Sequence, residues 1–240
     1  MSDAVIIKGL TKSYGGKTVV NNLDITVKSG TVFGLLGANG AGKSTVVDCI
    51  LGTKKADSGE IKLLGMNPEK NRRALFEKIG VQFQQGDCQK EIKVFELLEE
   101  TASLYRSPAD FNELCEQFGI SDKKNSYVKN LSGGERQRLF TVLSLIPNPK
   151  LVFLDELTTG LDAKARRDVW KTLETLKQKG LTVFMVSHFM DEVEALCDEI
   201  CILKKGTAVF CGTVEQAKRL CGCECFEDAY LILSDAEEEK

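Results

Sequence analysis

The sequence predicts an α/β fold with a largely parallel sheet. Short apolar runs of the kind found in buried strands alternate with longer segments in which apolar residues recur at helical spacing. A glycine-rich loop joins the first continuous apolar run to the helical segment after it. With 240 residues the chain is long enough for one large domain, or for a domain with a subdomain.

The first segments are rich in β-forming residues. Val5 to Leu10 and Val19 to Val27 flank the turn signal Tyr14-Gly15-Gly16, and we expect an antiparallel flap there. Thr31 to Leu36 is a continuous apolar run followed by glycine, which is typical of a buried strand. A helix is expected after Gly42, where apolar residues stand at helical spacing at Val46, Val47, Ile50 and Leu51.

The middle of the chain changes character. Ile79 to Phe83 is a strand candidate, and residues 94–147 are helical in pattern, with apolar positions at Phe95, Leu97, Leu98, Leu104, Phe111, Leu114 and Phe118. Strands return at Leu151 to Leu154, Thr182 to Val186 and Glu199 to Leu203. We therefore expect one domain over residues 1–225, with a helical subdomain at about 87–150 inserted in its core. A helix and an acidic tail follow at 226–240.

Composition excludes several classes of function. The chain is 42% hydrophobic and 28% charged, as in ordinary globular proteins, and its net charge of −3 gives no basic footprint for nucleic acid. It has no apolar run long enough to cross a membrane, and its polar start does not resemble a secretory signal. We expect a cytoplasmic protein unless a partner carries it to a membrane.

Nine cysteines without a signal peptide favour reduced thiols over a disulfide framework. Cys221, Cys223 and Cys225 could form a metal site. Their spacing is not the usual Cys-x-x-Cys, however, and the single histidine is distant in sequence, so a metal site there is disfavoured.

The glycine-rich loop has the pattern Gly-x-x-x-x-Gly-Lys-Ser, and Thr45 follows it. Glycines let backbone amides surround phosphate oxygens, and the next helix adds the positive end of its dipole. Lys43 supplies a point charge for the β- and γ-phosphates, and Ser44 offers a hydroxyl to Mg²⁺. The sequence therefore predicts ATP binding and hydrolysis through Gly37, Ala38, Asn39, Gly40, Ala41, Gly42, Lys43, Ser44 and Thr45.

A second motif is the apolar run Leu151 to Leu154 followed by two carboxylates. Ligands of such sheets lie at the carboxyl ends of strands, so Asp155 is expected to help hold Mg²⁺. Glu156 is expected to orient the attacking water or accept its proton. Strands that end in Asp-Glu are common, and this one indicates a catalytic site only because the phosphate loop lies upstream.

The third motif is Leu131-Ser132-Gly133-Gly134-Glu135, directly before a helical run. Ser132 followed three residues later by Glu135 forms a capping box. The hydroxyl and the glycine amides could also bind an anion at the helix N-terminus. The two interpretations are compatible.

These three motifs, in this order, resemble the nucleotide-binding domain of ABC (ATP-binding cassette) transporters. Leu131 to Glu135 matches the signature sequence of that family, and the resemblance extends from Val5 to about Leu233. It implies a P-loop NTPase (RecA-like) core with an N-terminal antiparallel β subdomain and an inserted α-helical subdomain. The implied activity is ATP hydrolysis coupled to transmembrane transport.

The resemblance assigns further residues. Tyr14 falls where the family stacks an aromatic ring on adenine, although it could be an exposed turn tyrosine. Gln84 matches the glutamine that reaches Mg²⁺ and the attacking water, with Gln82 and Gln85 as rivals because the register is inferred from spacing.

His188, after an apolar strand and Ser187, matches the histidine that contacts the γ-phosphate. Gly160-Leu161-Asp162 resembles the loop that crosses the dimer interface. One departure is Leu157, where the family often has a proline that stiffens the turn. It removes no catalytic group but leaves the turn geometry open.

The resemblance implies a head-to-tail homodimer or heterodimer of ATPase subunits that encloses two ATP molecules. Each ATP would contact Ser132, Gly133 and Gly134 of one subunit. From the other subunit it would contact Lys43, Ser44, Gln84, Asp155, Glu156 and His188. The dimer would power a separate ABC transmembrane permease subunit, and the chain would lie at the inner face of the cell membrane through that partner.

Residues 226–233 resemble the C-terminal helix of ABC ATPases that pair with ABC-2-type membrane subunits, which are mostly exporters of drugs, lipids, polysaccharides or peptides. The alternative is a generic closing helix that buries Phe226, Tyr230 and Leu233. Rival functions are a soluble ABC-type ATPase not coupled to transport, a nucleotide sensor that does not hydrolyse ATP, and a small-molecule kinase. The chain has one cassette and no heptad run, which disfavours the soluble ATPase. The presence of Glu156 and His188 disfavours a sensor that does not hydrolyse ATP, and the signature motif disfavours a kinase.

Overall fold

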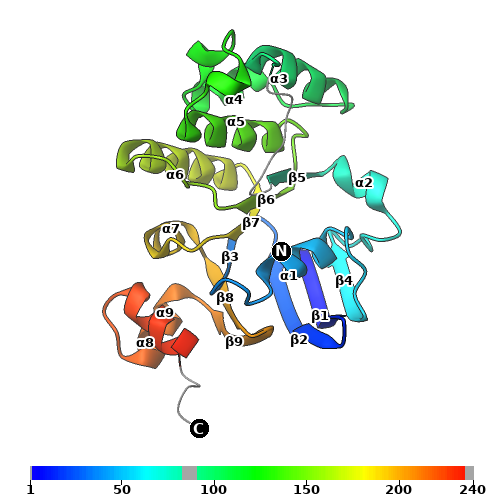
Figure 1. Ribbon diagram of the computed structural model, residues 1–240, viewed down its shortest axis with the longest axis vertical. Helices are drawn as coiled ribbons and strands as arrows, with labels where there is room; N and C mark the ends of the chain where they lie inside the picture. Colours follow the sequence, from blue (N-terminus) through cyan, green and yellow to red (C-terminus); the bar gives the residue numbers. More distant parts are fainter. Residues whose placement is uncertain (1, 83–90, 236–240) are drawn as a thin grey trace. The chain divides into compact units, whose positions relative to one another are not determined.

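A computed structural model describes residues 2–82 and 91–235 of the chain. The structure divides into two compact units, one made of residues 1–75 and 184–240 and the other of residues 76–183. The second unit is thus inserted in sequence between two parts of the first (Figure 1). Strand β7 (Thr182–Val186) and the short helix α2 (Arg72–Phe76) run across the boundaries between the units.

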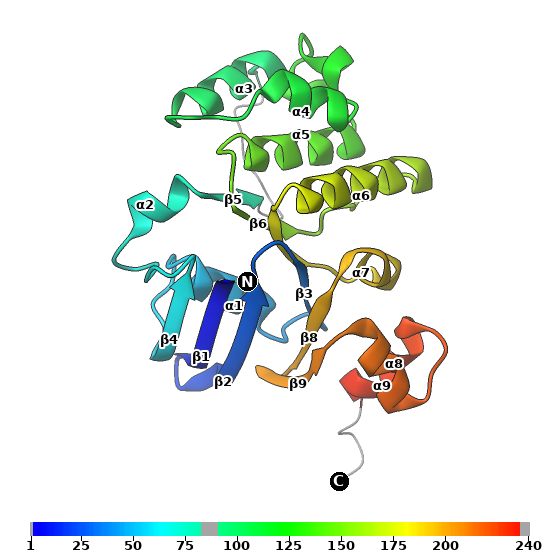
Figure 2. The same ribbon diagram turned by 180° about the vertical axis from the view of Figure 1, so that it is seen from behind.

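The first unit contains an antiparallel sheet of three strands, β1 (Asp3–Tyr14), β2 (Lys17–Lys28) and β4 (Ser58–Leu63). Strand β1 lies between the other two (Figure 2). It is buried at alternate positions such as Val5 and Ile7, which is the pattern of a sheet with one face on a core. The expected flap is confirmed, and β4 is an additional strand.

The first unit also holds the strands that carry the glycine-rich loop. Strand β3 (Val32–Gly37) is buried throughout and pairs in parallel with β8 (Glu199–Lys204). Strand β9 (Thr207–Gly212) returns antiparallel beside β8. The helices of this unit are α1 (Lys43–Ile50), α7 (Met190–Leu196), α8 (Val214–Cys221) and α9 (Phe226–Asp235).

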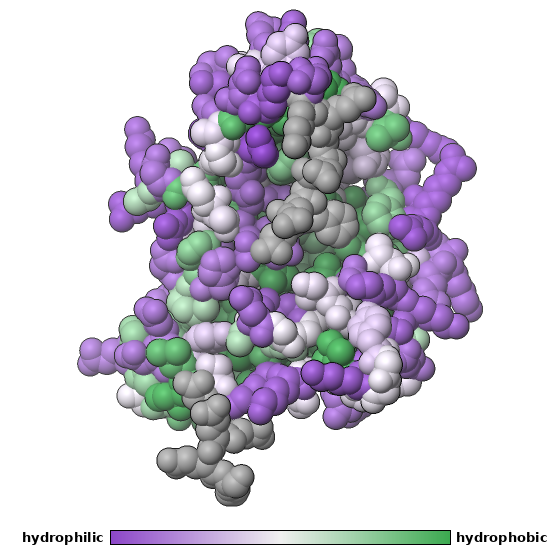
Figure 3. All heavy atoms as spheres, viewed as in Figure 1, coloured by the Kyte–Doolittle hydropathy of each residue, from purple (hydrophilic) through white to green (hydrophobic). Residues whose placement is uncertain are grey.

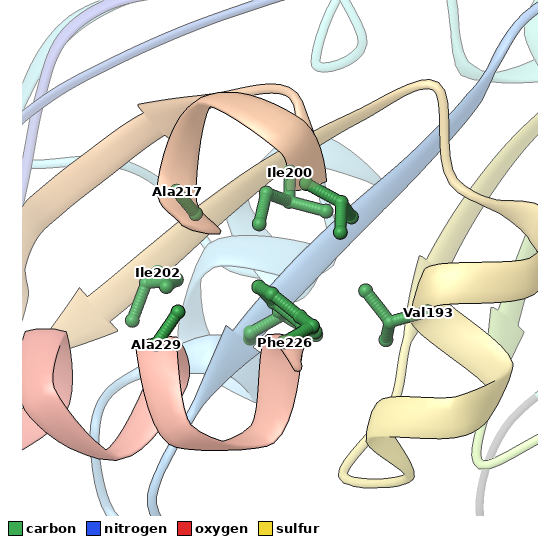
Figure 4. Close-up of a cluster of buried hydrophobic side chains, with 8 residues drawn as sticks. Val193, Ile200, Ile202, Ala217, Phe226 and Ala229 are labelled. Atoms are coloured by element: carbon green, nitrogen blue, oxygen red, sulfur yellow. The ribbon is translucent and has the colours of Figure 1, made fainter. Parts of the chain in front are cut away.

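Helix α9 closes the core of the first unit. Figure 4 shows Phe226 and Ala229 of α9 facing Ile200 and Ile202 of β8, with Val193 of α7 nearby. The Phe226 side chain is fully buried, and Tyr230 and Leu233 pack partly buried against the same cluster. The C-terminal helix therefore buries Phe226 fully and Tyr230 and Leu233 in part, on the face that its apolar spacing predicts.

The second unit pairs β5 (Ile79–Gln82) in parallel with β6 (Leu151–Asp155). Its helices are α3 (Val94–Ser103), α4 (Phe111–Gln117), α5 (Gly133–Leu145) and α6 (Ala163–Gln178), with short 3₁₀ turns at Ser121–Lys123 and Val128–Asn130.

Only some of the apolar positions expected to form the helical core are buried. Leu98, Leu114 and Phe118 are buried, whereas Phe95 is 37% and Leu104 71% exposed, because Leu104 lies beyond the last turn of α3. Elsewhere the helices α3 and α4, at the top of Figure 3, present a mostly hydrophilic surface. Among the described residues, no helix is both long and apolar enough to cross a membrane.

Helix α5 begins with the capping box that the sequence predicts. The Ser132 hydroxyl accepts the Glu135 N–H at 3.2 Å, and the Glu135 carboxylate accepts the Ser132 N–H at 2.8 Å. Lys123 also approaches this carboxylate, at 3.0 Å. The hydrogen bond from the Ser132 N–H, followed by that from Lys123, lowers the pKa of Glu135 from 4.5 to about 2.

A carboxyl whose pKa is lower in the folded state stabilises that state above its unfolded pKa, and the gain is lost as pH falls toward the folded pKa. We expect Glu135→Gln to lower the urea midpoint of unfolding at neutral pH, because glutamine keeps an acceptor but loses the charge. The difference from the parent protein should shrink as pH falls from 4.5 to about 2. Glu116→Gln, on the exposed surface of α4, controls for the loss of one negative charge. A gap that stays constant or widens in acid would contradict this prediction.

Candidate nucleotide-binding site

The glycine-rich loop follows β3 and adopts backbone conformations that favour glycine. Gly37, Gly40 and Gly42 have φ of 149°, 81° and 106°. A Cβ at Gly37 would collide with the backbone carbonyl of Leu203, and one at Gly42 would lie 2.8 Å from the carbonyl of Val19. The glycines of the motif are therefore needed here for close packing as well as for approach to a ligand.

Lys43 lies at the start of α1, and its ammonium folds back over the loop. It donates hydrogen bonds to the carbonyls of Gly37 at 2.7 Å and Ala38 at 3.2 Å. Ser44 is exposed and Thr45 half-buried in the first turn of the helix. The loop thus gathers a cation, a hydroxyl and the N-terminus of a helix, which together suit an anion such as a phosphate chain.

The loop is also braced from the turn between β8 and β9. The Gly206 N–H donates to the Ala41 carbonyl at 3.0 Å, and the Gly206 carbonyl accepts the Asn21 N–H at 2.9 Å. A Cβ at Gly206 would collide with the Val19 carbonyl, so glycine is required at this position too. This support could not be expected from the sequence, because its only local signal is the Lys205-Gly206 turn.

Tyr14 ends strand β1 and is 42% exposed. The ammonium groups of Lys12 and Lys54 lie 5.2 and 5.7 Å from the centre of its ring. A hydrogen bond to Asp57 raises the pKa of Lys12, so this lysine remains a cation at neutral pH. The ring is accessible for stacking, and its contact with adenine stays a prediction.

His188 follows β7, as expected, and is exposed, with its ring centre 4.2 Å from that of Phe189. The turn beside it is fixed by Ser187, which is buried. The Ser187 hydroxyl donates to the Glu192 carboxylate at 2.5 Å and accepts the Phe189 N–H at 3.1 Å. These bonds define the path of the chain through His188.

The acidic pair lies in the second unit, where Asp155 is the last residue of β6 and is half-buried. Glu156 has a φ of 52°, which is uncommon for a residue with a side chain. Gln137 of α5 donates to the Glu156 carbonyl at 2.7 Å and holds this turn. Leu157, where the family often has proline, is 1% exposed, so burial of its side chain helps to fix the turn that follows Glu156.

The signature motif also lies in the second unit. The Ser132 hydroxyl accepts the Glu135 N–H within its own helix, and its hydrogen bond with the Glu135 carboxylate also helps to lower the pKa of that carboxyl. A Cβ at Gly134 would lie 3.0 Å from the Gly160 carbonyl and from the Leu161 side chain, so the glycine permits close approach of the Gly160 to Asp162 loop. Asp162 in turn caps α6 by accepting the Ala165 N–H at 2.8 Å.

The predicted glutamine and one of its two rivals cannot be placed. Gln84 and its rival Gln85 lie outside the described residues. The other rival, Gln82, is buried, and its side-chain oxygen accepts a bond from the Thr141 hydroxyl at 2.9 Å. This bond disfavours Gln82, and the role of Gln84 stays a prediction.

The candidate residues therefore fall into two groups. The first unit holds Tyr14, His188 and the phosphate loop, and the second holds Asp155, Glu156 and the signature. Where side chains are described, no cluster of three or more His, Cys, Asp or Glu residues is arranged to hold a metal ion, and this applies to Cys221, Cys223 and Cys225.

Known proteins are similar in sequence to most of this chain. A family model described as ABC transporter matches residues 20–159. Nod factor export ATP-binding protein I of Rhizobium johnstonii is 40% identical over 211 residues, which are 86% of this chain and 68% of that protein. The protein of the same name from Ralstonia nicotianae is 36% identical over 227 residues, 92% of this chain and 71% of its own length.

Solved structures agree on the fold. An ATP-binding subunit of an ABC transporter superposes with a TM-score of 0.88 at 24% identity, covering 96% of this chain and 99% of that one. An ATP-binding cassette solved as a dimer in a post-hydrolysis state, bound to ADP and Pi, gives 0.78 at 24% identity, covering 87% and 98% of the two chains. The expected P-loop NTPase fold is confirmed. The chain belongs to the ABC transporter family, as an ATP-binding subunit whose hydrolysis of ATP is coupled to transport.

Proposed function

We propose that this chain is the ATPase subunit of an exporter and that it drives a separate ABC transmembrane permease. The observation that carries the proposal is 40% identity, across 86% of the chain, to a protein whose name describes export. The apolar C-terminal helix α9, which resembles that of ATPases paired with ABC-2-type membrane subunits, supports it. The chain acts at the cytoplasmic face of the membrane, held there by its partner.

Two chains bind head to tail and enclose two ATP molecules. In each site, Tyr14 stacks on adenine and the phosphate loop with Lys43 holds the phosphates. Ser132, Gly133 and Gly134 of the opposite chain contribute a hydroxyl and two amides to the γ-phosphate. The exposure of the Ser132 and Gly133 surface supports this assignment, since a second chain must reach it.

Catalysis is assigned to groups on both units. Glu156 orients the attacking water and accepts its proton, His188 contacts the γ-phosphate, and Gln84 helps to place the water. Ser44 and Asp155 offer hydroxyl and carboxylate oxygens, which are the donor atoms that Mg²⁺ prefers, so these residues with Gln84 fit a magnesium ion. Bound Mg²⁺ would neutralise charge on the phosphates. In this scheme ATP favours the closed dimer and hydrolysis favours its release.

Glu156→Gln should produce a dimer that persists in ATP, because the amide cannot accept the proton of the water. We expect hydrolysis to fall at least about 100-fold, and size-exclusion chromatography with light scattering should show a dimer only when ATP is present. The matched control is Glu227→Gln on the exposed side of α9, which should hydrolyse ATP like the parent protein. A Glu156→Gln protein that stays monomeric in ATP and keeps full activity would refute the assignment.

Ser132→Ala separates the cap from the proposed contact across the dimer. It should lower the stability of folding by about 1 kcal/mol and sharply lower hydrolysis, while a single chain keeps its affinity for ATP. Thr213→Ala is the control, because Thr213 and Gln216 form the same type of capping box on α8. It should cost similar stability without loss of hydrolysis. Equal hydrolysis by the two variants would show that Ser132 is only a cap.

The membrane partner is tested by co-expression with a multi-span membrane protein encoded beside this chain. We expect a share of the ATPase to move to the membrane fraction and to be retained through a salt wash. The chain expressed alone serves as the control and should remain in the supernatant. An unchanged distribution with every neighbouring membrane protein would favour the soluble ATPase instead.

A further inference from the structure

Two cysteines face each other across the β8–β9 pair. Cys201 on β8 and Cys211 on β9 are direct partners in the antiparallel register. Their neighbours Ile202 and Phe210 pack with the cluster beneath α9, so the alternation of side chains turns both cysteines toward the other face. The two sulfur atoms lie 2.9 Å apart and share a hydrogen bond.

The backbone separation suits a disulfide. Directly paired residues of antiparallel strands have Cα atoms about 4.5 to 5.5 Å apart, within the range of roughly 4.4 to 6.8 Å that a disulfide spans. The sulfur atoms need approach by only about 0.9 Å to reach the bonded distance. No rearrangement of the strands is therefore required.

The two thiols differ in access. Cys201 is fully buried, whereas Cys211 is exposed and lines a hollow of about 230 Å³ together with Phe33 and Glu199. A small reagent can therefore reach Cys211 but not Cys201.

The two thiols also differ in acidity. The hydrogen bond between the two thiols lowers the pKa of Cys211, and the same bond, with burial, raises the pKa of Cys201. Cys211 is thus the thiol that ionises first and acts as the nucleophile, and Cys201 is the thiol that lies ready to resolve a mixed disulfide on Cys211.

We propose that Cys201 and Cys211 form a thiol–disulfide exchange site for low-molecular-weight disulfides. The Cys211 thiolate attacks one sulfur of the small disulfide, whose S–S bond breaks and releases one thiolate. Cys201 then loses its proton and attacks the Cys211 sulfur, which breaks the mixed disulfide and releases the second thiolate to take up that proton. The two cysteines are oxidised, and one small disulfide is reduced to two thiols.

The site is connected to the phosphate loop through the fold. Strands β8 and β9 meet at the turn whose Gly206 N–H bonds to the Ala41 carbonyl. The bond between Cys201 and Cys211 would link these two strands covalently. This inference does not depend on export or on the identity of the membrane partner.

The test uses the full chain and hydroxyethyl disulfide, a neutral probe that is not repelled by Asp24 and Glu199 at the hollow. After brief exposure, mass spectrometry should show the loss of two hydrogens at Cys201 and Cys211 with no probe retained on either, while the exposed Cys225 reacts separately. Peptide mapping should find Cys201 linked to Cys211, and dithiothreitol should restore the starting mass.

Variants distinguish the two roles. Cys201→Ala should retain the probe on Cys211 as a stable mixed disulfide, because the responding thiol is gone. Cys211→Ala should leave Cys201 unmodified, and Cys225→Ser, which removes an exposed cysteine outside the pair, should still form the Cys201–Cys211 bond. Stable probe on Cys211 of the parent chain, or no modification of that residue, would overturn the proposal. The parent chain alone is enough to test the proposal, so the test remains valid even if a variant with a substitution in the core folds poorly.

Discussion

The constraint on which this structure depends is the close backbone packing around the phosphate loop. Gly37 lies against the carbonyl of Leu203, and Gly42 and Gly206 both lie against that of Val19. These approaches leave no room for a Cβ, so the loop can hold its shape only when β2, β8 and the β8–β9 turn are all in place. The shape of the loop is therefore a property of the three-dimensional packing of the first unit and not of the loop sequence alone.

Much of the fold could be predicted because its strongest signals are local. A continuous apolar run before the loop identifies β3, and the glycine turn at residues 14–16 identifies the β1–β2 hairpin. Strand β4 was missed because only Ile61 and Leu63 of its six residues are buried and it pairs with β1, far upstream. Strand β9 has no buried residue of its own and exists by pairing with β8.

The candidate site divides in the same way. Its motif residues could be chosen from sequence, because phosphate binding needs particular residue types at fixed spacing. The groups that hold those residues could not. Gln137, nineteen positions before Glu156, fixes the turn at that residue. The Gly206 N–H supports Ala41, although the whole inserted unit separates these two residues in sequence. Neither contact leaves a local pattern, because each depends on how the chain returns to itself.

The capping box at α5 shows how one motif can serve both the fold and a ligand. Ser132 uses its hydroxyl oxygen as an acceptor in the cap, and the same hydroxyl makes a hydrogen bond with the Glu135 carboxylate. Its own N–H is already taken by the Glu135 carboxylate, so the amides that remain for an anion are those of the glycines that follow. A carboxylate beside an anion site would ordinarily repel the ligand. Here Lys123 lies 3.0 Å from Glu135 and offsets its charge, so the carboxylate that caps the helix is not an uncompensated charge at its N-terminus.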